Sequence, residues 1–170
     1  MADLTAQHAF EFFRRSYTAV DGLWFMKAEA QFGFEAALAL DEAVWQVMPK
    51  IQARALKAVT GQARGLAALR ACLTTRLRWE EYSFEIASDD DGQGFTLTIR
   101  ACPWHRLLVK SGREGLASQI GPRICGSEYP LWAAEFGDDI RCELGPLICL
   151  GAGACVVRFR QEGGEDEDAS

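Results

Sequence analysis

The chain has 170 residues, which suits one domain, and 49% of them are apolar, so we expect a core of ordinary size. Its net charge is −6 without a basic stripe, which excludes nucleic acid as an expected partner, because the phosphate backbone supplies most of that affinity. The first residues lack the pattern of a secretory signal, and no apolar run is long enough to span a membrane. We therefore predict a cytoplasmic protein with no membrane partner.

The N-terminal part of the chain has helical periodicity. Apolar residues recur at three- and four-residue steps from Thr5 to about Phe32, and Gly33 ends this first helix. A second helix is expected over about 34–58. Pro49 should kink or split it, because proline cannot donate a hydrogen bond to the preceding turn. A third helix is expected over roughly 62–79.

The period then changes from 3.6 to 2, which is typical of strands. Two alternating segments, at about 82–86 and 95–99, flank the turn sequence DDDGQG and predict a β-hairpin. A short helix is expected over 104–110, and a further helical pattern over 114–136 is interrupted by Gly121-Pro122 and by Pro130. Two last strands are expected at about 139–144 and 154–160.

This order of elements, ααα-ββ-αα-ββ, predicts an α+β fold. The two hairpins favour an antiparallel sheet, and the N-terminal and later helices should pack on it. We expect residues 1–161 to form a single α+β domain. Residues 162–170, EGGEDEDAS, are predicted to be an acidic disordered tail, since they hold no large apolar residue.

The cysteines are unevenly distributed, because five of the six fall within one third of the chain. Cys125 and Glu128 share a helical face, and thiolates with one carboxylate form a reasonable four-coordinate zinc site. Two readings stay open for these cysteines: a metal-binding or reactive cluster, or small apolar fillers in a sheet core. The remaining thiol, Cys72, is predicted to be an inert core residue.

Two other polar residues attract attention. His105, in the sequence CPWH, either transfers a proton or binds a metal, or simply caps a helix. Asp41 lies in an apolar helical stripe, where it either belongs to a polar site within a pocket or pairs with an Arg or Lys. The candidate pocket residues are Trp24, Asp41, Trp45, Trp104 and Trp132.

Several catalytic signatures are missing. No P-loop, dinucleotide fingerprint, G-x-S-x-G elbow or H-E-x-x-H motif occurs in the chain, so we expect no nucleotide cofactor. With two histidines in all, a Ser-His-Asp triad has almost no room.

The C-terminal half resembles a known group of proteins. The run TLTIRACPWHRLLVKSGREGLASQIGPRICGSEYPLWAAEFG, with DDIRCELGPLICLGAGACVVRFR after it, is similar to bacterial 4-vinyl-reductase-type ligand-binding domains and to L-2-amino-thiazoline-4-carboxylic acid hydrolase-like proteins. The matching features are the turn at Cys102-Pro103, the helical Cys125, and a Gly-rich turn before Cys155. The N-terminal sequence DGLWFMKAEAQFGFEAALALDEAVW looks like that of a bacterial subgroup of such proteins.

This resemblance implies a helix-backed antiparallel sheet like the ligand-binding domains of nitric-oxide signalling and Golgi transport, often as a homodimer. It also implies a small apolar or aromatic ligand, and in some relatives a structural zinc. The ligands that it implies for zinc are Cys125, Cys149 and Cys155, with Glu128 or Cys142 as the fourth.

Three functions follow as hypotheses. The first is a small-molecule-binding module with a pocket between helices and sheet. The second is a thiol- or metal-dependent hydrolase of a small amide or cyclic C–N bond. The third is a module that dimerises or docks a partner.

Overall fold

The computed structural model describes residues 4–162, so all of the predicted tail except Glu162 lies outside the described part. The chain has two compact units, Met1–Val44 and Trp45–Ser170. No helix in the described part is long and apolar enough to cross a membrane.

The first unit consists of two helices, α1 (Ala6–Phe32) and most of α2 (Phe34–Trp45). Helix α1 begins with a capping box, in which the Thr5 side chain accepts a hydrogen bond from the His8 amide at 3.3 Å while His8 Nδ1 accepts one from the Thr5 amide. It ends at Gly33, whose φ of 86° favours glycine. The predicted first helix and its end are therefore confirmed.

In the second unit, α3 (Met48–Thr60) and α4 (Leu66–Trp79) precede the hairpin of β1 (Ser83–Ser88) and β2 (Gly94–Ala101). Pro49 lies in the first turn of α3, so the predicted split of the second helix is confirmed. Helix α5 (Pro103–Lys110) and a 3-10 turn, η1 (Glu114–Leu116), follow.

The chain then forms α6 (Ala117–Ala134), β3 (Ile140–Leu144), a second 3-10 turn, η2 (Ile148–Leu150), and β4 (Cys155–Gln161). Helix α6 is continuous through Pro122 and Pro130, so the predicted interruptions are wrong. Each proline removes one backbone hydrogen bond, but the burial of Tyr129, Trp132 and Ala133 holds the helix together.

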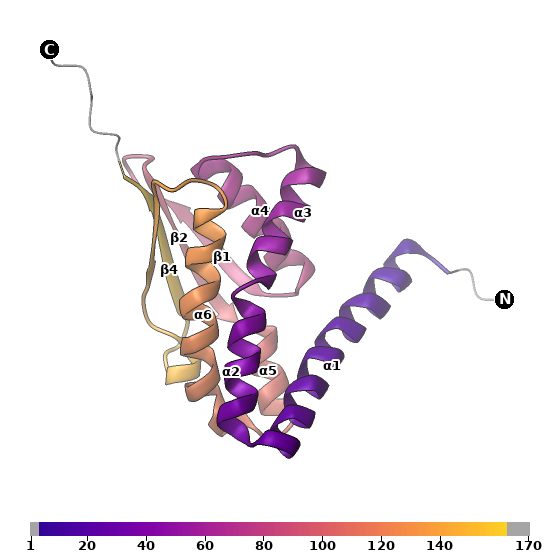
Figure 1. Ribbon diagram of the computed structural model, residues 1–170. Coiled ribbons are helices and arrows are strands. Elements are labelled where there is room, and N and C mark those ends of the chain that lie inside the picture. Colours follow the sequence, from indigo (N-terminus) through magenta and orange to yellow (C-terminus); the bar gives the residue numbers. More distant parts are fainter. Residues whose placement is uncertain (1–3, 163–170) are drawn as a thin grey trace, which may run out of the picture. The chain divides into compact units, whose positions relative to one another are not determined.

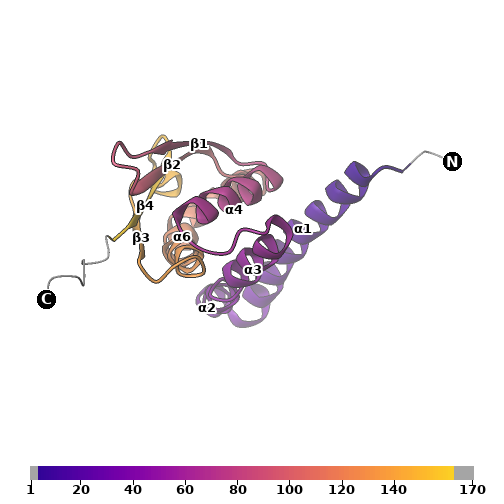
Figure 2. The same cartoon turned by 90° about the horizontal axis from the view of Figure 1, so that it is seen from above.

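The four strands form one antiparallel sheet in the order β1-β2-β4-β3. Figure 1 labels β1, β2 and β4, and Figure 2 labels all four strands. Its two hairpins meet where β2 pairs with β4, with Phe95 opposite Phe159 and Leu97 opposite Val157. These alternate residues are almost fully buried, whereas Arg158 and Arg160 on the other face are exposed. The sheet thus has one covered and one solvated face.

Helices α4 and α6 lie along the covered face, and α3 packs against both of them on the side away from the sheet (Figure 2). The fold is therefore α+β with helices on an antiparallel sheet of two hairpins, as predicted from the pattern. This arrangement leaves β1 and β3 at the two edges of the sheet.

Candidate functional site

An open groove of about 440 Å³ lies between α4 and the edge strand β1. The helix contributes polar side chains to it, and the strand and the residue before it contribute both polar and apolar ones. The lining residues are Arg70, Thr74, Arg78, Tyr82, Ser83, Phe84 and Ile86. No acidic residue is among them, although the whole chain has a net charge of −6.

The two walls of the groove follow from the periodicity of each element. Helix α4 buries the stripe that contains Leu69, Leu73 and Leu77, and this leaves Arg70 and Arg78, with Thr74 between them, in a row at four-residue steps. On β1, the side chains of Tyr82, Phe84 and Ile86 alternate onto the face that packs against the core. One wall is therefore cationic and the other apolar.

A tight corner brings β1 back alongside α4. The amide of Tyr82 donates to the carbonyl of Leu77 at 2.9 Å, and that of Glu81 donates to Arg78 at 3.1 Å. Glu81 adopts a left-handed conformation with φ of 61°, where glycine is more usual. The strand consequently runs antiparallel to the helix, and Ser88 at its far end meets Arg70.

The two guanidinium groups differ in their partners. Arg70 Nη1 donates to Ser88 Oγ at 2.7 Å, which orients this side chain across the groove. Arg78 is exposed, and among residues 4–162 no carboxylate pairs with it. A guanidinium beside an apolar wall with no acid in the lining is suited to binding an anion that carries an apolar portion.

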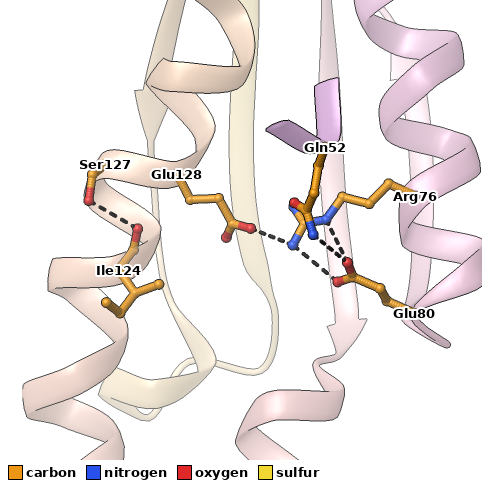
Figure 3. A network of polar contacts seen from close by, with 6 residues as sticks. All are labelled: Gln52, Arg76, Glu80, Ile124, Ser127 and Glu128. Carbon is orange, nitrogen blue, oxygen red and sulfur yellow. Dashed lines mark hydrogen bonds and ion pairs between the residues drawn. The ribbon is translucent and has the colours of Figure 1, made fainter. Parts of the chain in front are cut away.

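Tyr82 links this groove to the interior. Its side chain lies near the Cys102 thiol, and burial raises the pKa of Tyr82 well above its ordinary value. Beside it lies a buried polar network. Arg76 bonds Glu80 with two contacts of 3.1 Å and forms an ion pair with Glu128, as Figure 3 shows. The charged groups behind the groove wall thus pair with one another, although Arg76 Nη1 has no hydrogen-bond partner among the described residues.

Four cysteines from different elements lie together in the second unit. Cys102 precedes α5, Cys125 is in the middle of α6, Cys149 is in η2 and Cys155 begins β4. We call these four residues the thiol cluster. They are close enough that each thiolate would raise the pKa of its neighbours.

A backbone amide donates to one of these sulfur atoms. Cys155 Sγ accepts a hydrogen bond from the Ile148 amide at 3.2 Å. Burial nevertheless raises the pKa of all four thiols, and that of Cys125 most clearly. In the absence of a bound cation, the four thiols are therefore protonated near neutral pH.

The structure separates the predicted zinc ligands. Cys125, Cys149 and Cys155 belong to the thiol cluster, whereas Glu128 is buried against Arg76, and Cys142 lies opposite Phe159 in the sheet. No three His, Cys, Asp or Glu side chains between residues 4 and 162 are arranged so that they could share a metal ion as they stand.

The predicted pocket residues do not line the groove. Trp24 and Asp41 belong to the first unit, where Trp24 is exposed and Asp41 is half-buried. Trp45 and Trp104 meet edge to face with their ring centroids 5.6 Å apart, and Trp132 is a core residue stacked on Phe136. Trp45, Trp104 and Trp132 therefore pack against other aromatic rings.

Sequence reasoning missed the groove and one member of the thiol cluster. The four-residue steps of Arg70, Thr74 and Arg78, opposite a Leu stripe, were a signal for a cationic helix face. Nothing in the sequence places that face against a strand edge. Cys102 was among the five clustered cysteines, but only the fold shows that it meets Cys125.

A family model described as a family of unknown function, DUF6125, matches residues 5–143. The matched range includes both walls of the groove together with Cys102 and Cys125, and it ends before Cys149 and Cys155. No curated protein matches the chain.

Proposed function

The chain belongs to the DUF6125 family, and we propose that it is a binding protein whose ligand carries a negative charge next to an apolar portion. The observation that supports this proposal is the exposed guanidinium of Arg78, without a carboxylate partner among the described residues, in a groove whose opposite wall is apolar. Ligand sites of this kind combine apolar lining with a few polar groups that fix orientation.

The charge of the groove refines the expectation of a purely apolar ligand. The hydrogen bond to Ser88 already orients Arg70. An anion that enters the groove therefore meets this oriented guanidinium and that of Arg78, which has no carboxylate partner among the described residues. Phe84 and Ile86 offer contact to the apolar portion. A hydrolase with a cysteine nucleophile is less well supported, because the thiol cluster has raised rather than lowered pKa values.

Calorimetric titration with matched pairs of ligands tests the proposal. Phenylacetate and octanoate should bind, while phenylacetamide and octanamide should bind at least about tenfold more weakly, because charge-assisted hydrogen bonds are lost. Arg78→Gln should weaken the acids similarly. Arg64→Gln removes an exposed arginine that does not line the groove, and it should bind like the wild type. Equal binding of acids and amides would contradict the proposal.

We also propose that the thiol cluster holds one zinc ion. Four thiolates form a common tetrahedral site, and the Ile148 amide that donates to Cys155 Sγ would stabilise charged sulfur there. Binding requires the four thiols to lose their protons and to turn toward a common centre, since they are not arranged for it as they stand. Bound zinc would serve a structural role by joining α5, α6, η2 and β4.

Elemental analysis of the purified protein tests this second proposal. We expect about one zinc per chain, with four thiols becoming titratable after chelation. Cys102→Ser should lose the metal, and Cys142→Ser should keep it, because Cys142 lies outside the cluster. A metal-free protein with freely titratable cluster thiols would be decisive against it.

A further inference from the structure

We infer that the ligand of the groove is an extended acidic peptide segment of a partner protein, which pairs with β1 as a fifth strand of the sheet. The inference rests on the groove being the binding site proposed above. Three features of the described residues support it: the unpaired edge of β1, the spacing of the two arginines, and the apolar wall between them.

The first feature is the edge of the sheet. Strand β1 pairs with β2 alone among the described strands. The amide of Asp89 donates to the carbonyl of Gly94 at 3.0 Å, and the pairing continues in regular register to Phe84, with Ala87 opposite Thr96 and Glu85 opposite Thr98. An irregularity in the register follows between Phe84 and Ser83. In an antiparallel pair, alternate residues of a strand form both backbone hydrogen bonds with the neighbouring strand, and on β1 these are Glu85, Ala87 and Asp89. The residues between them direct their amides and carbonyls away from β2, toward the open edge of the sheet. These outward residues are Phe84, Ile86 and Ser88.

The second feature is the spacing of positive charge along the groove. Arg70 and Arg78 are eight residues apart on α4, which corresponds to roughly 12 Å along the helix axis. In an extended chain, residues i and i+4 lie on the same face and roughly 13 Å apart. Two acidic residues four positions apart on an added strand would therefore reach both guanidinium groups at once.

The third feature is the middle of the groove. Thr74 lies between the two arginines on the helix, and Phe84 and Ile86 lie opposite it on the strand. The side chain at i+2 of the peptide faces this position, so a small apolar residue fits there better than a charged one. The preferred segment is thus acidic at i, apolar at i+2 and acidic at i+4.

Addition of a strand beside a helix is an established mode of peptide recognition, in which main-chain bonds supply affinity and alternate side chains supply specificity. A compact carboxylate would engage one guanidinium and leave the second arginine and the strand edge unused. The two charges along an unpaired edge therefore favour a peptide over a compact anion.

Binding of acetylated, amidated ten-residue peptides to the full-length protein tests the inference. A peptide with the central sequence ETVTE should bind, and the same peptide with QTVTQ should bind at least about tenfold more weakly. Moving the second acid by one position, as in ETVTTE, should weaken binding similarly, because adjacent side chains of a strand point to opposite faces. Arg70→Gln and Arg78→Gln should each reduce affinity, and Arg64→Gln should not.

Two further measurements separate strand pairing from charge attraction alone. N-methylation of the central valine should weaken ETVTE, because it removes a main-chain donor. In amide hydrogen exchange, ETVTE should slow the exchange of Phe84, Ile86 and Ser88 more than that of Glu85 and Ala87, which already bond to β2. Equal binding of the N-methylated peptide, with no selective protection, would overturn the inference.

The outcomes also distinguish the inference from the proposal on which it rests. If phenylacetate binds in an Arg78-dependent way and ETVTE does not, the groove binds anions and the peptide inference fails. If neither binds, both fail. A peptide that copies residues 162–170 belongs in the panel, and if it alone binds, the groove is filled by the chain's own end and the inference of a partner is overturned.

Discussion

Arg76 and Glu128 form a buried ion pair that joins α4 to α6, with side chains that are 3% and 5% exposed. Arg76 also bonds Glu80, whose carboxylate accepts a further hydrogen bond from Gln52 of α3 at 3.2 Å. The guanidinium of Arg76 in α4 thus connects to α6 through Glu128 and to α3 through Glu80 and Gln52.

Removing the guanidinium should be costly. Arg76→Met leaves Glu128 and Glu80 without a buried counter-charge, and we expect a loss of about 3–5 kcal/mol in the free energy of unfolding. Urea denaturation followed by circular dichroism measures it. Arg54→Met is the matched control, because the Arg54–Glu135 pair also joins two helices but Arg54 is 68% exposed. A similar loss in both variants would contradict the assigned role of burial.

The acid of this pair should make stability depend on pH. Burial raises the pKa of Glu128 above its ordinary value of about 4.5, although Arg76 opposes the shift. The folded state therefore holds the proton more tightly than the unfolded state. This contribution is fully present below about pH 4.5 and is lost as pH rises through the folded pKa.

Glu128→Gln cannot ionise and removes that dependence. The stability of the wild type relative to this variant should fall as pH rises from about 4.5 toward neutrality. Urea unfolding curves of both proteins at several pH values provide the measurement. A relative stability that instead grew with pH would show that the attraction of Arg76 outweighs burial.

Two glycines of α6 should respond in opposite ways to alanine. A Cβ at Gly121 would lie 2.5 Å from Cys149 Sγ and 2.9 Å from its Cβ, whereas one at Gly126 would meet nothing within 4 Å. We expect Gly126→Ala to stabilise by about 0.5–1 kcal/mol, as is usual in helices, and Gly121→Ala to destabilise.

Adding Cys149→Ala to Gly121→Ala should recover part of that loss, because it removes the nearer of the two contacts. Thermal unfolding of the wild type, Gly121→Ala, Cys149→Ala and the double variant measures the coupling between the two positions. If Gly121→Ala stabilised the protein as Gly126→Ala does, the close approach of Cys149 in η2 to Gly121 in α6 would be contradicted.

Cys142 should react slowly with alkylating agents at neutral pH. Burial raises its pKa to about 12, some three to four units above that of an ordinary thiol at about 8.5. Its alkylation by iodoacetamide should therefore be about a thousandfold slower than that of a free thiol, and it should accelerate about tenfold per pH unit. Peptide mapping by mass spectrometry reads the rate, and urea-unfolded protein should react at the ordinary rate.

The sequence by itself determined most of the secondary structure and the class of the fold. The apolar period of 3.6 in α1 and of 2 in β1 and β2 reports which side of each element is buried, and that choice is local. Gly33 ends α1, and Pro49 lies in the first turn of α3 after the predicted split, since the backbone restrictions of glycine and proline are local. Pro122 and Pro130 do not interrupt α6, because packing of α6 on the sheet outweighed the two lost hydrogen bonds.

Only the tertiary structure decided which distant residues meet. Glu128 and Cys125 share one helix, yet one pairs with Arg76 and the other lies among thiols from three further elements. The cationic groove likewise depends on α4 lying beside an edge strand, and the order β1-β2-β4-β3 decides which strand is at the edge. Side-chain periodicity records burial along one element, whereas a site depends on contacts between elements, and these are set by the packing of the whole domain.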